Sequence, residues 1–349
     1  MPLISTFCPR NYLLIDNAPI EISIGLEVHT QLNLLYKLFS GSLDTLTTLD
    51  VGLPGSLPVV NFSSMFGLYA LASLLHAKTS RWLSFTRKGY FCADLALGYQ
   101  ITQFHNPLLS CGFLEVWSVA VNGACCALIA HIQGVNLEHD AGSTTSLRGR
   151  QIVSFSRAGL GLLEFVSLPC FDSAFFVKLY LLKLKLILKC LRVSFCVMAD
   201  AEMRYDFNIS VSKPLCARSA RIEIKNLNSL SGLDCITLSE AAAARGGSKS
   251  YTKAVELKTF VTSFLRRKET MREYKRLLEA DIPFIPVLIS KPTVQHRTVR
   301  LSERALWIVS CGLVSFLQTN DSELILTQAL IFSCFGFKFL GLVLKEPLL

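Results

Sequence analysis

The chain has 349 residues, which is enough for two domains or for one large domain with an appendage. Hydrophobic residues make up 51% of it and charged residues only 17%, so a sizeable core is expected, and the net charge of +9 favours polyanionic partners such as nucleic acid. Its 12 cysteines include no CxxC spacing, which favours free thiols in a reducing compartment over a disulfide framework or a zinc site.

Residues 1–20 are expected to form an N-terminal extension before the folded domain. They contain neither a charged segment followed by an apolar run nor an Arg- and Ser-rich amphipathic pattern, so no export or transit signal is predicted. We therefore expect a cytoplasmic protein, with an organellar matrix as the open alternative.

The first regular element is predicted as a strand. Apolar residues occupy every second position from Ile22 to Val28, and polar residues lie between them. A period of two is typical of a strand with one face on a core. Glu27 and His29 then project from the other face, where a carboxylate and an imidazole could share one divalent cation. The alternative is an exposed face that happens to carry both residues.

The middle of the chain is expected to alternate between loops and strands. Pro54, Gly55 and Pro58 predict a tight loop, after which a helical stretch runs to about residue 76. Residues 88–107 mix aromatic residues, glycines and polar residues without a steady period, which is typical of a loop-rich binding segment. Strands are expected at 114–121 and 127–132, before an acidic cluster at 138–140, and a turn followed by a strand is expected at 155–169.

A long apolar helix is predicted between residues 174 and 199. Four lysines and Arg192 interrupt its apolar surface, which indicates a soluble helix with a basic edge and not a membrane span.

Two further strands repeat the pattern of the first. The stretches 202–212 and 221–225 place apolar residues on one face and acids, bases and amides on the other. Three such strands suggest an antiparallel sheet with one side on a core and one polar side that suits a nucleotide, a metal ion and a charged substrate. The sequence contains no P-loop and no Rossmann glycine motif, so bound ATP would depend on metal held by carboxylates.

From residue 237 onward the chain is expected to be mainly helical. It passes through a basic segment around residues 266–276, and after residue 291 it becomes increasingly apolar. The stretch 324–344 has the length of a membrane span, but burial against a partner protein is the favoured interpretation and no membrane attachment is expected.

Seven stretches, in order and covering about residues 25–290, resemble the B-subunit family of the tRNA-dependent amidotransferases. They are GLEVHTQLNLLYKLFSGS, GLPGSLPVVN, RKGYFCADLALGYQITQF, VNLEHDAG, SRAGLGLLEFVSLP, MRYDFNISV and RIEIKNLNS. A weaker match is RKETMREYKRLLEADIPFI, and GLVSFLQTNDSELI resembles the start of the family's helical domain.

The resemblance implies an α+β fold, with an antiparallel-sheet catalytic cradle of the glutamine synthetase and guanidino kinase type over residues 21–290. A shortened helical domain would follow at 291–349, without the family's tail domain. The implied activity is ATP-dependent phosphorylation and amidation of the side-chain carboxylate of Glu-tRNA(Gln), Asp-tRNA(Asn) or both, with ATP and Mg²⁺ as cofactors. The implied partners are misacylated tRNA, an A (amidase) subunit that supplies ammonia, and the C subunit of a heterotrimer.

Site residues are carried over where the motifs match. The resemblance implies catalytic roles for Glu27, His29, Glu138, Arg204, Asp206 and Glu223, with Glu164 in the same cradle. It implies metal ligation by Glu27, His29, Glu138 and His139, and nucleotide binding by Lys88, Asn208, Lys225, Asn226 and Asn228. Substrate contacts are implied for Tyr90, Asp94, Tyr99, Gln100 and Arg157, and the basic charge of Arg266, Arg267, Arg272 and Lys275 suggests tRNA binding.

The chain also departs from the family pattern. Asn136 and His139 stand where the family usually has His and Glu in the acidic cluster, and Ala199 replaces a carboxylate. One alternative is therefore a subunit that scaffolds its partners without kinase chemistry. A free-standing basic RNA-binding protein is another, although no stretch interleaves aromatic and basic residues in a single-strand-binding pattern.

Overall fold

The computed structural model describes residues 13–15, 18–61, 66–119, 125–212, 219–227, 229–244, 251–256, 261–267 and 275–287. Contacts along the chain divide it into two units. The larger unit consists of Cys8–Val116 and Leu128–Leu288, and it contains every residue of the site below. The other unit comprises Met1–Phe7, Trp117–Ala127 and Ile289–Leu349.

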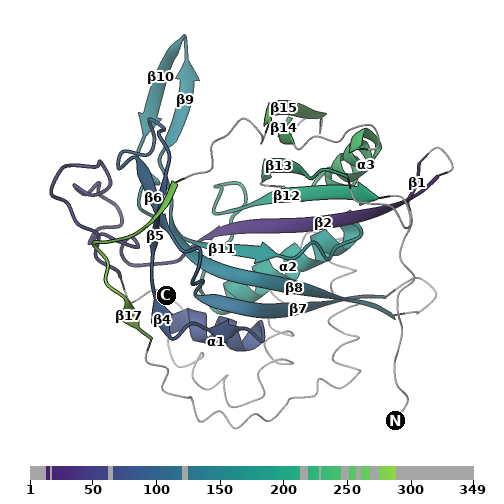
Figure 1. The fold of residues 1–349 in the computed structure, drawn as a ribbon, viewed down its shortest axis with the longest axis horizontal. Coiled ribbons are helices and arrows are strands. Elements are labelled where there is room, and N and C mark those ends of the chain that lie inside the picture. Colours follow the sequence, from purple (N-terminus) through teal and green to yellow (C-terminus); the bar gives the residue numbers. More distant parts are fainter. Residues whose placement is uncertain are drawn as a thin grey trace, which may run out of the picture. The chain divides into compact units, whose positions relative to one another are not determined.

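A large, mostly antiparallel sheet forms the centre of the larger unit (Figure 1). Its strands are β1 (Leu13–Ile15), β2 (Ala18–Gln31), β3 (Lys78–Thr79), β7 (Leu109–Val119), β8 (Cys125–His139), β11 (Gly161–Ser167), β12 (Met203–Ser212), β13 (Ile222–Leu227), β14 (Tyr251–Glu256) and β15 (Val261–Arg267). They follow the order β15-β14-β13-β12-β2-β11-β8-β7-β3, with β1 paired to β2. β2 therefore lies in the middle of the sheet, antiparallel to β12 and β11.

The alternating stretches of the sequence are confirmed as β2, β12 and β13. On β2 the side chains of Ile24, Leu26 and Val28 are at most 1% exposed, and on β12 Tyr205 and Phe207 are fully buried. Burial of every second residue stabilises a strand on one face only, so the opposite face is left for polar side chains. β2 begins at Ala18, inside the stretch expected to precede the domain.

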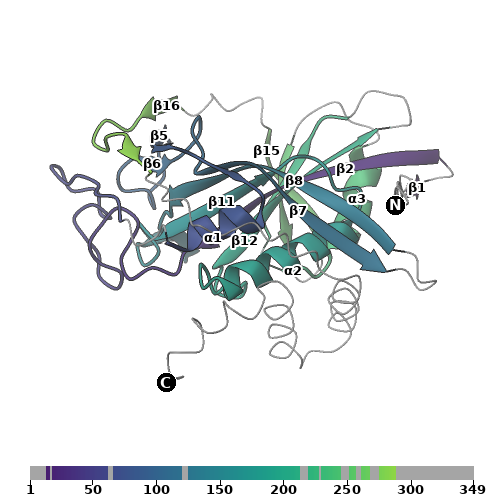
Figure 2. The ribbon, with the colours of Figure 1, turned by 90° about the horizontal axis from the view of Figure 1, so that it is seen from below.

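Helix α2 (Ala174–Cys190) covers the apolar face of the sheet (Figure 2). Val177 and Tyr180 on this helix are fully buried, and the ring of Tyr180 packs against Phe171 with 5.1 Å between the ring centroids. Lys178 pairs with Asp234 near the start of α3 (Leu233–Ala244), which contacts β12. The predicted helix with a basic edge is thus confirmed, although it ends before residue 199. In the described part of the chain no helix has both the length and the apolar character needed to cross a membrane.

Short strands complete the larger unit beside helix α1 (Phe66–Leu74), which is the helical stretch predicted before residue 76. They are β4 (Trp82–Leu83), β5 (Thr86–Gly89), β6 (Tyr99–Thr102), β9 (Ser143–Leu147), β10 (Arg150–Ser154), β16 (Lys275–Leu278) and β17 (Ile285–Pro286). Three of them form a small sheet in the order β16-β5-β6, and among the described residues β9 pairs with β10 alone.

Three expectations from the sequence are wrong or incomplete. The segments 251–256, 261–267 and 275–278 are strands and not helix, because pairing of β14 with β13 and of β16 with β5 overrides their local preference. The segment 88–107 is mostly loop, as expected, but it also contains part of β5 and all of β6. β7 and β8 extend well beyond the predicted strands. The helical domain expected at 291–349, including 324–344, lies outside the described residues.

Candidate functional site

One face of the sheet carries polar side chains from five adjacent strands, and we call it the polar face. Residues paired directly across antiparallel strands project from the same side of a sheet. Glu27 on β2 lies opposite Asp206 on β12, and His29 lies opposite Glu164 on β11. The same pairing and alternation assign to this face Asn136 and Glu138 on β8, Arg204 and Asn208 on β12, and Glu223 and Lys225 on β13.

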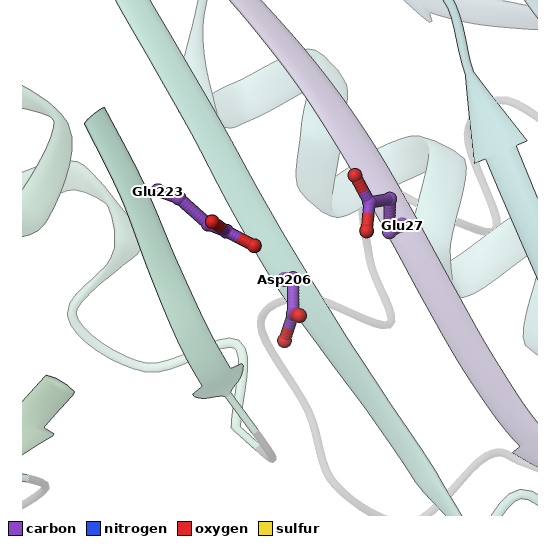
Figure 3. Close-up of side chains that lie close together, drawn as sticks. All are labelled: Glu27, Asp206 and Glu223. Carbon is purple, nitrogen blue, oxygen red and sulfur yellow. The ribbon is translucent and has the colours of Figure 1, made fainter. Parts of the chain in front are cut away.

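Three carboxylates, Glu27, Asp206 and Glu223, converge on the polar face (Figure 3). One oxygen of each lies within 4.8 Å of the corresponding oxygens of the other two. Asp206 and Glu223 are buried, and Glu27 is half-buried. Burial raises the pKa of Glu27 above its ordinary value of 4.5, and the negative charges of Glu164, Asp206 and Glu223 raise it further. The arrangement therefore favours the binding of a cation.

Lys225 supplies one positive charge beside the three carboxylates. Its Nζ lies 3.3 Å from Asp206 Oδ2 and 3.2 Å from Glu223 Oε1. Burial alone would lower the pKa of Lys225, but the two carboxylates outweigh burial and raise it, so the side chain is protonated at neutral pH. Glu27 accepts a hydrogen bond from Asn208 Nδ2 at 3.3 Å.

Three buried atoms on the polar face have no hydrogen-bond partner among the described residues. They are His29 Nδ1, Asn136 Oδ1 and Asn208 Oδ1. Buried polar atoms normally have a partner, so these atoms indicate a place where a further ligand fits. Carboxylate and amide oxygens are the ligands that Mg²⁺ prefers in proteins. The donor set around Glu27 and Asn208 therefore fits a hard divalent cation.

His29 lies beside a fourth carboxylate and not at the centre of the three. Its Nε2 is 3.7 Å from Glu164 Oε1, and the other oxygen of Glu164 accepts a hydrogen bond from Asn136 Nδ2 at 2.9 Å. The structure therefore brings His29 onto the same face as Glu27, as the alternation predicts, with Glu164 as its acidic neighbour.

Glu138 lies buried at the end of β8, where β6 crosses close to it. Its carboxylate accepts a hydrogen bond from Gln100 Nε2, and Gln100 Oε1 accepts one from the Tyr90 hydroxyl at 3.2 Å. Burial raises the pKa of Glu138, and the positive charge of Lys88 partly offsets this rise. Gln100 and Tyr90, which the family resemblance places near the substrate, thus also hold Glu138 in position.

His139 does not join these carboxylates. Alternation along β8 places it with Leu137 on the face opposite to Glu138. Its Nδ1 accepts a hydrogen bond from the Ile101 N–H at 2.9 Å, and its ring packs edge-on against Phe39. Burial lowers the pKa of His139 to about 4, so the ring is neutral at neutral pH. We therefore leave His139 out of the ligand set that the family resemblance implied.

Two arginines meet at the buried carboxylate of Asp140, directly after β8. Arg157 donates to Oδ2 from Nε at 3.0 Å, and Arg204 donates to Oδ1 from Nη2 at 3.0 Å. Arg157 also donates to the carbonyl oxygens of Asp200 and Ala201, at 3.1 and 3.2 Å, and so fixes the turn before β12. Burial lowers the pKa of Arg204, but Asp140 raises it by more. The guanidinium of Arg157 is thus engaged within the protein, while Arg204 is oriented on the polar face.

A cavity of about 510 Å³ lies along the polar face. Its acidic lining residues are Glu27, Glu138 and Glu164, its basic ones are Lys88, Arg221 and Arg276, and its aromatic ones include Phe104 and His105. Cavities of this size hold small-molecule ligands. Basic and acidic groups in one cavity suit a ligand that carries phosphates together with a metal ion.

The remaining residues assigned from the sequence occupy other positions. Asp94 accepts a hydrogen bond from Thr144, and the ring of Tyr99 lies 4.5 Å from the Arg87 guanidinium. The backbones of Arg266 and Arg267 lie on β15, which three strands separate from β2, while those of Lys275 and Asn226 lie on β16 and β13. Asn228 and Arg272 lie outside the described residues.

Three residues of the site gained no role from the sequence, and a fourth, Arg276, was expected only as part of the basic tRNA-binding segment 266–276. Arg221 and Arg276 line the cavity, Thr102 donates to Glu138 at 2.9 Å, and Asp140 binds the two arginines. The position of Thr102 two residues after Gln100 could have indicated it, had 99–102 been recognised as a strand. The others depend on contacts between segments distant in the sequence, which no local pattern predicts.

Comparison with known proteins adds a second kind of observation. The family described as the GatB/GatE catalytic domain matches residues 22–294. The B subunit of the aspartyl/glutamyl-tRNA(Asn/Gln) amidotransferase of Anaplasma marginale (strain St. Maries) is 32% identical over 298 residues, which cover 81% of this chain and 60% of that protein. The mitochondrial B subunit of the glutamyl-tRNA(Gln) amidotransferase of Schizosaccharomyces japonicus is 34% identical over 282 residues, covering 76% and 56%. The chain thus spans less than two thirds of the length of these relatives.

Proposed function

The chain belongs to the GatB/GatE family, and from this premise we propose that it activates and amidates misacylated tRNA, either Glu-tRNA(Gln), Asp-tRNA(Asn) or both. The observation that carries the proposal is the polar face, where three carboxylates converge beside a cavity lined by Lys88, Arg221 and Arg276. ATP carries a polyanionic chain together with a divalent metal ion, and this face offers groups of both charges.

The proposed reaction has two steps. A carboxylate resists direct amidation because its leaving group would be oxide. An oxygen of the substrate's side-chain carboxylate attacks the γ-phosphorus of ATP, the bond to the bridging oxygen breaks, and ADP leaves. Ammonia then attacks the acyl carbon, phosphate leaves with the electrons of the C–O bond, and the nitrogen loses a proton to give the amide.

The proposed roles follow from charge and position. Glu27, Asp206 and Glu223 would hold Mg²⁺, which spreads the negative charge of a phosphoryl group when it is bound. Lys88 and Arg276 line the cavity and would bind phosphate oxygens. These groups act by position and charge, because preorganised charges cost no reorganisation at the moment of reaction.

Arg204 is suited to the substrate's own carboxylate. It lies opposite His29 on the polar face, and Asp140 fixes its guanidinium through a hydrogen bond at 3.0 Å. A guanidinium presents several donors in a fixed plane, which matches a carboxylate. Asn208 and Lys225 complete the proposed face beside Glu27.

Two of the three departures from the family pattern lie off the polar face, whereas Asn136 lies on it and donates a hydrogen bond to Glu164 at 2.9 Å. His139 faces the other side of the sheet, so a histidine there leaves Glu27, Asp206 and Glu223 in place. Ala199 lies in the exposed turn before β12. This placement supports an active subunit over a scaffold that has lost kinase chemistry.

The relatives' names describe them as subunits of an amidotransferase, and we propose the same setting for this chain. Ammonia would come from an A (amidase) subunit, and a C subunit would complete a heterotrimer. The test is reconstitution with A and C subunits on each misacylated tRNA, with amide formation and ATP hydrolysis followed together. We expect ATP hydrolysis to rise with misacylated tRNA and not with the same tRNA after deacylation. Glutamine hydrolysis without any tRNA-stimulated ATP hydrolysis would identify a scaffold subunit instead.

A further inference from the structure

The hairpin formed by β9 and β10 stands apart from the main sheet (Figure 1). Its register runs from Leu147 opposite Arg150 to Ser143 opposite Ser154. All five residues of β9 are exposed, as are four of the five residues of β10. An isolated two-stranded hairpin is only marginally stable in water. Both faces of this arm are exposed to solvent, so a bound partner could stabilise it.

The side chains of this arm have a consistent chemistry. No acidic residue occurs anywhere from residue 141 to residue 163. Arg148 and Arg150 lie at the tip, and hydroxyl groups line the strands at Ser143, Thr144, Thr145, Ser146 and Ser154. Arginine, serine and threonine are the side chains that contact phosphate and sugar oxygens in protein–nucleic acid complexes.

The turn at the tip does not by itself account for its arginine. Arg148 has φ of 49° and Gly149 has φ of 75°, which are the positive values of a two-residue type I′ turn. Asn, Asp and Gly adopt positive φ most readily, so local geometry favours Asn at position 148. The long cationic side chain there serves no purpose in the turn and points to a role in binding.

The base of the arm is tied to the site. The Gly142 N–H donates to the Asp94 carbonyl oxygen at 2.9 Å, and the Thr144 hydroxyl donates to the Asp94 carboxylate at 3.0 Å. The two strands emerge between Asp140 and Arg157, which pair with each other, and Asp140 also pairs with Arg204 on the polar face. Five strand residues extend roughly 17 Å. The tip can therefore reach a macromolecule whose end lies in the site.

We infer that the β9–β10 hairpin binds the sugar–phosphate backbone of the tRNA close to its aminoacylated end. The inference rests on the proposed function, which places that end at the polar face. The positive charge of Arg148 and Arg150 complements phosphate, and the exposed apolar side chains of Leu147 and Ile152 can cover ribose. The contact is with the backbone, so it contributes affinity and orientation without reading the base sequence.

The test removes the two charges without weakening the hairpin. Arg148→Asn suits the type I′ turn, and Arg150→Gln keeps a long polar side chain in the strand. The matched control is Lys185→Gln with Lys189→Gln on α2, which removes two charges from the helix on the apolar face. Binding of misacylated tRNA to the reconstituted complex is measured by filter binding across a series of KCl concentrations, with thermal melting to confirm the fold.

Each lost phosphate contact lowers the slope of log affinity against log salt by roughly 0.7 to 0.9. We expect the hairpin variant to lose about 1.5 units of slope and about tenfold affinity near 0.15 M salt, and the α2 variant to match wild type. ATP hydrolysis at saturating misacylated tRNA should stay at the wild-type level.

The outcomes separate this inference from the proposed function. An unchanged slope with stimulated ATP hydrolysis intact overturns the inference alone, and would direct attention to a protein partner for Leu147 and Ile152. A reduced slope in a complex whose ATP hydrolysis never responds to misacylated tRNA supports the hairpin as an RNA contact while the proposed function fails. A wild-type complex that binds no tRNA overturns both.

Discussion

Replacing Glu27 by Gln removes one negative charge from the three carboxylates and keeps the shape of the side chain. One oxygen of Glu27 lies within 4.8 Å of oxygens of Asp206 and Glu223. Two unit charges at that distance repel by roughly 3.5 kcal/mol at an effective dielectric constant of about 20. Solvent and the nearby Lys225 reduce this repulsion. We therefore expect the metal-free variant to exceed wild type in stability by about 1 kcal/mol, or roughly 2 °C in Tm.

The sign of this effect with pH follows from the raised pKa of Glu27. In the folded chain burial and neighbouring carboxylates hold that pKa above 4.5, whereas the unfolded chain ionises near 4.5. Ionisation of Glu27 therefore lowers the free energy of unfolding as the pH rises above that value. The stability advantage of Glu27→Gln should be absent below about pH 4.5 and should grow as the pH rises from there through the raised pKa of Glu27.

With magnesium, wild type should become more stable than Glu27→Gln. Saturation at 100 times the dissociation constant stabilises a protein by about 2.7 kcal/mol, which is roughly 5 °C for a domain of this size. Wild type should gain this shift in thermal melts with MgCl₂, and Glu27→Gln should lose most of it together with amide formation. Glutamine hydrolysis by the partner subunit should persist.

The matched control is Glu21→Gln, which makes the same change on β2 roughly 20 Å away. It should keep the wild-type response to magnesium. A wild-type magnesium shift in Glu27→Gln would refute the assignment of Glu27 as a ligand, and the loss of the same shift in Glu21→Gln would show that the assay does not report on the site.

Three further predictions test the neighbours of this group. Lys225→Met leaves two buried carboxylates without their ammonium, so it should cost about 3 to 5 kcal/mol in denaturant melts, with partial recovery in millimolar Mg²⁺. His139→Ala should leave magnesium affinity unchanged but lower the free energy of unfolding by about 1 to 3 kcal/mol, because the Ile101 N–H loses its acceptor. In wild type, protonation of His139 should lower the free energy of unfolding as the pH falls from 6.5 to about 4. Asp140→Asn should reduce tRNA-stimulated ATP hydrolysis at least tenfold while tRNA binding persists, because Arg204 loses its salt bridge. An equal loss of ATP hydrolysis and of tRNA binding would mean that Asp140 supports only the fold.

The alternation of residues predicted the central strands well, because side chains on a strand alternate between faces wherever it pairs. It therefore placed Glu27 and His29 on one face before any partner strand was known. The same logic failed at 261–267 and 275–278, where strands replace the expected helix. Their strand structure depends on pairing with β14 and β5, and such pairing is invisible in local composition.

The site residues also divide into those that the sequence predicted and those that only the fold placed. Family motifs named most of the residues on the polar face, and they grouped His139 with Glu138 because His139 stands where the family usually has an acid in the same cluster. Adjacent residues on a strand face opposite sides, so the fold turns His139 toward Phe39 and leaves Glu138 with Gln100.

By itself, then, the sequence determined the apolar and polar faces of the strands, the position of α2 and the family, because each rests on local periodicity or on motifs. Only the tertiary structure decided which carboxylates meet. Glu27 contacts Asn208, 181 positions away, and lies opposite Asp206, because β12 pairs with β2 in one register. A slip of one residue in that register would turn Asp206 to the apolar face. Register is fixed by burial of the apolar side chains of both strands and by their pairing across the sheet, and these are long-range interactions that no single segment contains.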